Sequence, residues 1–175
     1  MLSDNDLYFQ LKIDSKKESA FRILYDRYSS SLFRFIYRFT LNKQVAEEIL
    51  HDIFIQLLSD KYNASEGNLK SWLFAVAKNK SLNHAKKASF ETSDDLAIAE
   101  ATSESDFEQS FINYNLLKNL SLLESNLPSD LRLTWNLKKQ GLDYQQISQT
   151  LSIPVGTVKS RFSRLVDHLK KEFYS

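Results

Sequence analysis

The sequence predicts an all-α fold of two small helical domains joined by a flexible acidic linker, with a helix-turn-helix in the C-terminal domain. Apolar residues recur three or four positions apart through most of the chain, as on one face of an α-helix. Only three glycines and two prolines occur in 175 residues, so helix breakers are rare. Charge is segregated, which suggests separate roles for adjacent segments. Five lysines and no acid lie from Gly67 to Phe90, and seven acids without lysine or arginine lie from Glu91 to Glu108.

The composition excludes several classes of protein. Without cysteine there is no disulfide framework and no thiolate metal site. The three histidines (His51, His84 and His168) are too widely spaced to suggest a metal cluster. No apolar run approaches the roughly 18 residues that a membrane helix needs, and the N-terminus lacks a signal-peptide pattern. We therefore expect a cytoplasmic protein without stable membrane insertion that needs no metal or cofactor.

Two helices are predicted at the N-terminus. A short amphipathic helix should run from Asp4 to about Ile13, with Leu7 and Leu11 facing inward. The pair Asp14-Ser15 is expected to cap a longer helix, in which a stripe of apolar and aromatic residues recurs at helical spacing. This stripe consists of Phe21, Leu24, Tyr25, Tyr28, Leu32, Phe35, Ile36 and Phe39. We interpret it as part of the core.

The third predicted helix, about Lys43 to Leu58, has two contrasting faces. The face expected to be buried carries Ala46, Ile49, Leu50, Ile53, Phe54 and Leu57. The opposite face carries Glu48, His51, Asp52 and Ile55. A single exposed isoleucine usually means nothing. This one lies at the centre of the face opposite the core, where a partner would dock.

A lysine-rich helix is predicted from near Leu69 to about Lys87, after a polar loop, with Trp72, Leu73, Val76 and Ala77 on its buried side. Lysines alone would indicate only a solvated face. Together with aromatic rings and amides they fit single-stranded nucleic acid better, because cations follow phosphates, rings stack on unpaired bases and amides read base edges. The candidate residues are Tyr62, Asn63, Asn68, Lys70, Trp72, Asn79, Lys80, Asn83, Lys86 and Lys87.

The linker is predicted at 89–109. Its serine, alanine, threonine and acidic residues surround isolated apolar ones, and such a composition cannot bury enough surface to order itself. Helical periodicity resumes from Phe111 with Leu116, Leu117, Leu120 and Leu123. It breaks at Leu127-Pro128, after which Ser129-Asp130 opens a helix that should end at Gly141 in C-cap position.

The last predicted elements are two helices joined by a tight turn. Asp143 can cap the first helix, and Gln146 stands at capping-box distance from it. Tyr144, Ile147 and Leu151 should bury one face of that helix, and Ser148, on the same helix, is expected to hydrogen-bond the Tyr144 carbonyl. The turn is Ser152-Ile153, and Pro154 suits the first turn of the helix that follows.

That final helix has an apolar stripe of Val155, Val158, Phe162, Leu165, Leu169 and Phe173. Its other faces combine small polar residues with cations, which suits entry into a DNA major groove. Hydroxyls allow close approach, and arginine or lysine reaches phosphates and guanine edges. The candidate residues are Thr157, Lys159, Ser160, Arg161 and Arg164. Periodicity alone fits an amphipathic hairpin that closes a bundle equally well.

A family resemblance favours the DNA-binding interpretation. The run Gly156-Thr-Val-Lys-Ser-Arg161, preceded by Gln146-Ile147 and Leu151-Ser-Ile-Pro-Val155, resembles the last DNA-binding segment of extracytoplasmic-function (ECF) sigma factors of bacterial RNA polymerase. Ser71-Trp72-Leu73 with Ala77-Lys-Asn79 resembles their promoter-melting segment. The resemblance covers nearly the whole chain in the right order. It departs from the usual pattern at His51, Ser148 and Ser152, where glutamine, alanine and glycine are common.

The resemblance implies a domain plan. Residues 1–88 would form sigma region 2, which binds core polymerase and recognises and melts the minus-ten element. Residues 89–109 would form the linker, and 110–175 would form region 4, which recognises the minus-thirty-five element. The motif Glu48, His51, Asp52 and Ile55 would grip a coiled coil on the largest polymerase subunit, and the loop before Trp72 would hold a flipped base. In the family the linker runs through the polymerase near its active site.

The expected partners are core RNA polymerase and promoter DNA. The chain would be an alternative sigma factor that directs transcription initiation, has no enzymatic activity, and is a monomer when free. Its formal net charge is only +1, so we expect the free protein to bind promoter DNA poorly. Many family members are controlled by an anti-sigma factor, and the sequence leaves open whether this one is.

Two other classes of function fit the sequence less well. An operator-binding regulator would usually be a dimer matched to paired half-sites, and nothing in the sequence suggests a dimerisation helix. A helical enzyme would need acid, base or metal ligands clustered in a pocket, and the histidines lie on unrelated helices.

Overall fold

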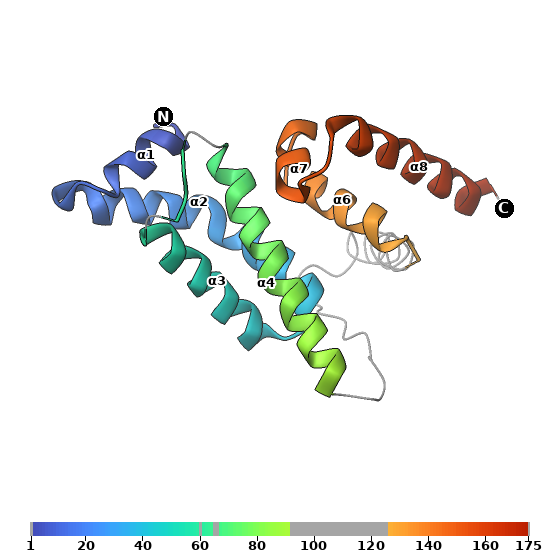
Figure 1. The fold of residues 1–175 in the computed structure, drawn as a ribbon, viewed down its shortest axis with the longest axis horizontal. Helices are drawn as coiled ribbons and strands as arrows, with labels where there is room; N and C mark the ends of the chain where they lie inside the picture. The colour runs from blue at the N-terminus through green and yellow to red at the C-terminus, as the bar shows by residue number, and fades with distance from the viewer. Residues whose placement is uncertain (1, 60, 65–66, 92–125, 175) are drawn as a thin grey trace, which may run out of the picture.

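A computed structural model describes residues 2–59, 61–64, 67–91 and 126–174. All the secondary structure in these ranges is helical (Figure 1), which confirms the all-α prediction. The helices are α1 (Asp4–Gln10), α2 (Asp14–Thr40), α3 (Lys43–Leu58), α4 (Leu69–Glu91), α6 (Ser129–Lys139), α7 (Tyr144–Leu151) and α8 (Val155–Tyr174). The predicted linker beyond Glu91 and the predicted helix from Phe111 lie outside the described residues.

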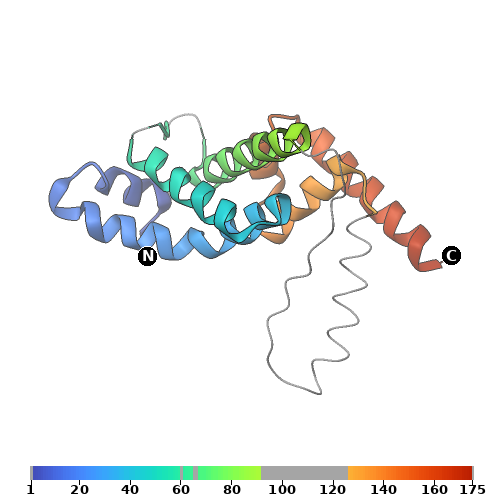
Figure 2. The same ribbon diagram turned by 90° about the horizontal axis from the view of Figure 1, so that it is seen from below.

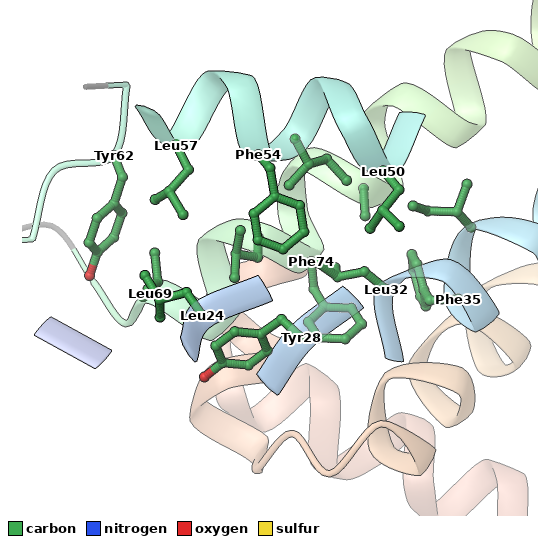
Figure 3. Packing of buried hydrophobic residues seen from close by; sticks show 14 of the residues in the cluster. Leu24, Tyr28, Leu32, Phe35, Leu50, Phe54, Leu57, Tyr62, Leu69 and Phe74 are labelled. Atoms are coloured by element: carbon green, nitrogen blue, oxygen red, sulfur yellow. The ribbon is translucent and has the colours of Figure 1, made fainter. Parts of the chain in front are cut away.

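Helices α1 to α4 pack around a common hydrophobic core, in which α2 contacts both α3 and α4. Figure 3 shows side chains of α2, α3 and α4 converging on this core. The rings of Phe35 and Phe74 meet edge to face with centroids 5.4 Å apart, a favourable arrangement for an aromatic pair. Burying a large apolar side chain completely stabilises the fold by about 1.5–3 kcal/mol.

Helix α3 matches its prediction in bounds and in burial. All six residues expected inside are at most 8% exposed: Ala46, Ile49, Leu50, Ile53, Phe54 and Leu57. The helix starts at an Asn42 cap, whose side-chain oxygen accepts a hydrogen bond from the Val45 N–H at 3.2 Å. The simple 3.6-residue periodicity succeeds here because one face of α3 meets the core along its whole length.

The predicted cap of α2 is wrong. Ile13 occupies the N-cap position and makes no side-chain hydrogen bond, and Asp14 is already the first helical residue. The chain passes from α1 into α2 through a single tight turn, which leaves Asp14 inside the first turn of α2. Its carboxylate there lies at the positive end of the helix dipole and is still favourable.

A polar network fixes the loop before α4. The Tyr8 hydroxyl donates to the Tyr62 carbonyl oxygen at 2.7 Å, and the Tyr62 hydroxyl donates to the Gly67 carbonyl oxygen at 2.7 Å. Asp4 accepts hydrogen bonds from Arg27 and Tyr28, which ties α1 to α2. Burial and the Asp4 carboxylate raise the pKa of Tyr28 well above its usual range, so this phenol stays protonated.

The C-terminal half keeps most of its predicted local structure. Helix α6 starts after Leu127-Pro128, and Gly141 has the left-handed φ of 75° that favours glycine. The capping box at the start of α7 is present: Gln146 N–H donates to Asp143 Oδ1 at 2.8 Å, and Asp143 N–H donates to Gln146 Oε1 at 3.0 Å. Ser152 makes the turn with a left-handed φ of 55°.

Two details of α7 differ from prediction. Tyr144 is 36% exposed rather than buried, because its ring stacks on the outside of Phe162 with centroids 5.0 Å apart. The Ser148 hydroxyl donates to the Ile153 carbonyl oxygen at 2.5 Å instead of to Tyr144. Ser148 therefore closes the turn that follows α7, a contact that side-chain-to-backbone bonding within one helix does not suggest.

The N- and C-terminal helices pack against each other. Helix α7 lies beside α4 (Figure 1), and the main core continues into the C-terminal half. The C-terminal members of this core are Leu137, Leu142, Ile147 and Val158. Both Figure 1 and Figure 2 show the far end of α8 pointing away from α1 to α4. No helix in the described ranges has the length and apolar character needed to span a membrane.

Candidate functional site

The outward face of α3 is exposed as expected. Glu48, His51, Asp52 and Ile55 all lie on the surface, and the Ile55 side chain is 46% exposed. Sequence reasoning missed Leu58, which is 40% exposed and follows Ile55 by three residues, so the two lie side by side on the helix surface. The face therefore presents a small apolar patch bordered by acids, a composition suited to binding another protein.

Asp52 connects this face to α4. Its Oδ2 atom lies 2.8 Å from Nζ of Lys80, a residue expected to bind a melted strand. The two predicted surfaces are thus neighbours. Because both side chains are partly exposed, the pair contributes at most about 1 kcal/mol, and Lys80 can exchange Asp52 for another anion at low cost.

The loop before α4 forms one wall of a pocket of about 190 Å³. Its lining includes Tyr62, Asn63, Gly67, Asn68, Trp72 and Gln149. This volume is below the range of sites for drug-sized ligands and suits one small flat group. Sequence reasoning placed the loop and Trp72 here but missed Gln149, which comes from α7 and carries no local signal that would have predicted it.

Two residues of this loop have structural contacts that limit the roles expected for them. Tyr62 is 3% exposed and its ring meets Tyr8 edge-on at 4.8 Å, so it cannot stack on a base without rearranging. Asn68 accepts the Ser71 N–H at 3.3 Å and thereby caps the start of α4. Trp72 is half-buried at the pocket wall, and the centroid of its ring lies 5.6 Å from that of the Tyr62 ring.

The first half of α4 faces α7. Lys70 Nζ donates to the Gly141 carbonyl oxygen at 3.0 Å, and Lys78 Nζ donates to the Thr150 carbonyl oxygen at 3.1 Å. Burial lowers the pKa of both Lys70 and Lys78, because removing water disfavours the ammonium form. These lysines are committed to the C-terminal helices rather than to solvent.

The second half of α4 is open. Asn79, Asn83, Lys86 and Lys87 are all exposed, and the two asparagines stand four residues apart on one side of the helix. The melted-strand residues predicted from the sequence are therefore divided: this group faces solvent, while Lys70 and the pocket lie against or beside α7.

Helix α8 presents most of its predicted DNA-reading surface. Lys159, Ser160 and Arg164 are exposed and Thr157 is half-buried. Arg161 differs, since its side chain is only 18% exposed and its Nε lies 3.4 Å from Asp130 Oδ2. Arg164 Nη2 lies 2.7 Å from the same oxygen but keeps 59% of its side chain exposed.

Asp130 is part of this surface, although no local pattern around it predicts a place there. It lies in the first turn of α6, where its carboxylate forms ion pairs with Arg161 and Arg164 of α8. The contact spans more than thirty positions of the chain, so helical periodicity could not have predicted it. Among the described residues no cluster of three or more histidine or carboxylate side chains could hold a metal ion.

Comparison with known proteins adds an independent finding. The family model described as sigma-70 region 2 matches residues 24–91, which span most of α2 together with α3 and α4. The chain is 28% identical over 151 residues to the ECF RNA polymerase sigma factor SigM of Bacillus subtilis, covering 84% of this chain and 91% of that protein. It is 24% identical to the RNA polymerase sigma-H factor of Pseudomonas aeruginosa, covering 98% and 95% of the two chains.

Solved structures support the same fold. CnrH, in a complex with the cytosolic domain of CnrY, is similar with a TM-score of 0.68 at 18% identity, over 97% of this chain and 96% of that one. The sigma factor RpoE of Bartonella quintana, in a complex with the anti-sigma factor NepR, gives a TM-score of 0.61 at 22% identity, over 86% and 94%. The two solved structures show the fold that this chain shares with them. Residues 24–91 match sigma-70 region 2, and over most of its length the chain is similar to ECF RNA polymerase sigma factors.

Proposed function

We propose that this chain acts as an alternative, ECF-type sigma factor that binds core RNA polymerase and directs promoter recognition, DNA melting and transcription initiation. The match to sigma-70 region 2 over residues 24–91 carries this proposal. The exposed face of α3 and the exposed cationic surface of α8 support it, because a sigma factor needs one surface for the polymerase and another for the promoter.

Polymerase binding is assigned to the outward face of α3. Ile55 would supply the apolar anchor, and Glu48, His51 and Asp52 would make polar contacts around it. An anchor of this kind dominates many protein interfaces, because a central apolar side chain loses its water while the rim excludes solvent. Leu58 would enlarge the anchor.

Capture of the melted minus-ten strand is assigned to α4 and the loop before it. Asn79, Lys80, Asn83, Lys86 and Lys87 would follow the strand along the helix. The pocket beside Trp72, with Asn63 and Asn68, would take one extruded base. Extrusion costs a few kcal/mol, so these contacts must favour the open strand over the duplex. Lys70 could contribute only where the Gly141 carbonyl oxygen does not hold it, and Tyr62 would support the pocket from behind.

Recognition of the minus-thirty-five element is assigned to α8. Thr157, Lys159 and Ser160 would approach the DNA closely, and Arg164 would reach a base edge or phosphate. Arg161 would support this surface from its half-buried place against Asp130. Readout of this kind relies on a bidentate arginine and on small residues that allow the helix to enter the groove.

The proposed division of labour follows a domain plan of 1–88, 89–109 and 110–175, and the site of action would be the bacterial cytoplasm, where core polymerase works. No chemistry or cofactor of its own is required. Both solved neighbours were captured with a protein partner, NepR being named an anti-sigma factor. A partner of that class is accordingly part of the proposal.

Reconstituted run-off transcription tests the proposal. Purified core polymerase with this chain should produce transcripts from a subset of a promoter library, and core polymerase alone should not. A DNA-binding regulator that never engages polymerase would instead bind duplex DNA without supporting initiation. Failure to start transcripts at any promoter, with the protein folded, would refute the proposal.

A further inference from the structure

Helix α1 holds the loop before α4 from outside the segment that matches sigma-70 region 2. The match begins at residue 24, whereas α1 covers Asp4–Gln10. The Tyr8 hydroxyl donates to the Tyr62 carbonyl oxygen across 54 positions of the chain. Tyr8 is 2% exposed and Tyr62 is 3% exposed, and their rings meet edge to face. Loss of this bond would be costly, because a buried carbonyl oxygen without a donor cannot readily turn to water instead.

A second bond continues from Tyr62 to the start of α4. The Tyr62 hydroxyl donates to the Gly67 carbonyl oxygen at 2.7 Å, and Oδ1 of Asn5 in α1 lies 3.1 Å from the same hydroxyl oxygen. One hydroxyl hydrogen cannot serve both acceptors at full strength, so the shorter contact, to Gly67, is the stronger one. Burial raises the pKa of Tyr62 above its ordinary value of 10.0, so the phenol keeps the hydrogen that it donates. Tyr62 therefore connects α1 with Gly67.

Helix α1 is itself attached to α2, which makes it a fixed support for this loop. The Asp4 carboxylate accepts a hydrogen bond from Arg27 at one oxygen and from Tyr28 at the other. Leu7, in the middle of α1, is fully buried in the main core. A movement of α1 would have to break these contacts as well as those to Tyr62.

The two bonds of Tyr62 bear directly on the pocket proposed to take an extruded base. The pocket lining includes Tyr62, Gly67 and Asn68 from the loop and Trp72 from α4. The Tyr62 ring also contacts the Trp72 ring, with centroids 5.6 Å apart. A binding site keeps its productive geometry only if its groups are held to within about 0.5 Å. The loop wall therefore depends on whatever holds Tyr62.

We propose that α1 positions the wall of the base pocket: Tyr8, and to a smaller extent Asn5, are positioning residues that act through Tyr62 on capture of the extruded base. This inference rests on the proposed function, since it concerns the same pocket. Neither Tyr8 nor Asn5 lines the pocket. Both would therefore affect promoter melting, in which the base leaves the duplex, and not polymerase binding, which is assigned to α3.

The first experiment separates base capture from the other steps of initiation. Tyr8→Phe removes the hydroxyl and keeps the ring. Tyr37→Phe is the matched control, because Tyr37 is a half-buried tyrosine of α2 that does not line the pocket. Core polymerase with each variant initiates on a promoter that the unmodified chain transcribes, supplied as a duplex or with its minus-ten region opened by mismatches. The mismatches remove the melting cost that capture of the base helps to offset.

We expect Tyr8→Phe to lower initiation on the duplex about fivefold relative to Tyr37→Phe, the effect of losing one hydrogen bond. On the opened template the two variants should initiate equally. Equal initiation on the duplex would overturn the inference. An equal loss on both templates would also overturn it, because a fault in folding or in polymerase binding lowers both.

Asn5→Ala keeps the inference testable if thermal unfolding shows that Tyr8→Phe is not folded at the assay temperature. Asn5 is exposed, so its replacement leaves the core intact. Compared with the unmodified chain, Asn5→Ala should lower initiation on the duplex by less than Tyr8→Phe does and leave the opened template unchanged. If Tyr8→Phe is unfolded and Asn5→Ala initiates like the unmodified chain on the duplex, the inference fails.

The second experiment examines the pocket without DNA or polymerase. Trp135→Phe leaves Trp72 as the only tryptophan of the chain, so its fluorescence reports on the pocket. Acrylamide quenching is measured after Tyr8→Phe or Tyr37→Phe is added to this background. Tyr8→Phe should raise the quenching constant, because Tyr62 can then move away from the indole ring. Equal quenching in the two variants would overturn the inference.

The two experiments also distinguish failure of the inference from failure of the proposed function. If the unmodified chain initiates at no promoter, the proposed function fails, and the quenching of Trp72 still decides whether α1 positions the pocket. If the unmodified chain initiates but Tyr8→Phe behaves like Tyr37→Phe on the duplex, the inference fails and the proposed function stands.

Discussion

Helices α3 and α4 each have a polar face that helical spacing predicts. The face of α3 is exposed in the structure, whereas the face of α4 is partly covered. On α3 the polar face opposite the core is open, with Ile55 at its centre. On α4 the corresponding polar face is divided, because Lys70 and Lys78 bind carbonyl oxygens of the C-terminal half, at Gly141 and Thr150, while Lys86 and Lys87 are exposed. The difference shows that a polar face predicted from helical spacing is only a face turned away from the local core. Whether solvent or another helix meets it depends on distant parts of the chain.

The largest expected effect concerns the open surface of α3. Ile55→Asp should weaken binding to core polymerase by about 2 kcal/mol or more, because a charge replaces the apolar anchor of the interface. Titration of labelled protein with core enzyme measures this. Ile13→Asp is the matched control, since Ile13 is also 46% exposed but lies at the start of α2. Equal losses in the two variants would show that the α3 face is not the docking surface.

The two arginines of α8 repeat the contrast between an open and a covered side chain. Arg164→Ala should weaken promoter binding by about 1–3 kcal/mol if Arg164 reads a base, with little change in thermal stability. Arg161→Ala should mainly lower the unfolding temperature, by about 2–4 °C for each kcal/mol of stability removed. Promoter titration of the holoenzyme and calorimetry measure the two effects. An exchange of the two phenotypes would mean that Arg161 is the reader.

Sequence reasoning succeeded where the determinants are local. The bounds and burial of α3, the Asp143–Gln146 capping box and the turn at Ser152 all depend on residues within a few positions of one another. Each involves a backbone preference or a face that repeats every 3.6 residues. The bounds of α4 were less accurate, since it runs to Glu91 and not to about Lys87.

Sequence reasoning failed where the determinants are distant. Lys70 donates a hydrogen bond to the carbonyl oxygen of Gly141, 71 positions further along the chain. Asp130 meets Arg164 across 34 positions, and Gln149 reaches the pocket from a different half of the protein. No periodicity encodes such contacts, because they follow from how packed helices dock. Family resemblance supplied the functions but not this arrangement.

The two ends of α4 provide a smaller and sharper test. Replacing Lys86 and Lys87 by alanine should weaken binding of single-stranded DNA to the free chain. The slope of the logarithm of the binding constant against the logarithm of the salt concentration should fall in magnitude by about one for each phosphate that is no longer neutralised. Lys70→Ala should leave strand binding by the free chain unchanged, because the Gly141 carbonyl oxygen already holds that lysine, and should weaken strand binding only in the polymerase complex. Binding of single-stranded DNA over a salt series, with and without core enzyme, measures this. A weaker affinity of Lys70→Ala in the free chain would mean that the covered half is accessible.

The smallest effect lies in the core that supports both surfaces. The pKa of Tyr28 is raised in the folded chain, so its protonated form contributes stability that is present below its ordinary value of 10.0 and is lost as the pH rises above that. Lys70 and Lys78 act in the opposite sense, since their lowered pKa values make the folded chain more stable as the pH rises toward 10.5.

Tyr28→Phe should lower the free energy of unfolding by about 1 kcal/mol at neutral pH, because the Asp4 carboxylate loses a hydrogen-bond donor. Tyr28→Phe should also reduce the fall in the free energy of unfolding above pH 10. Tyr37→Phe, on the same helix, is the control and should leave that pH dependence intact. Urea unfolding at neutral and alkaline pH measures both quantities, and identical slopes in the two variants would show that Tyr28 is not the titrating group.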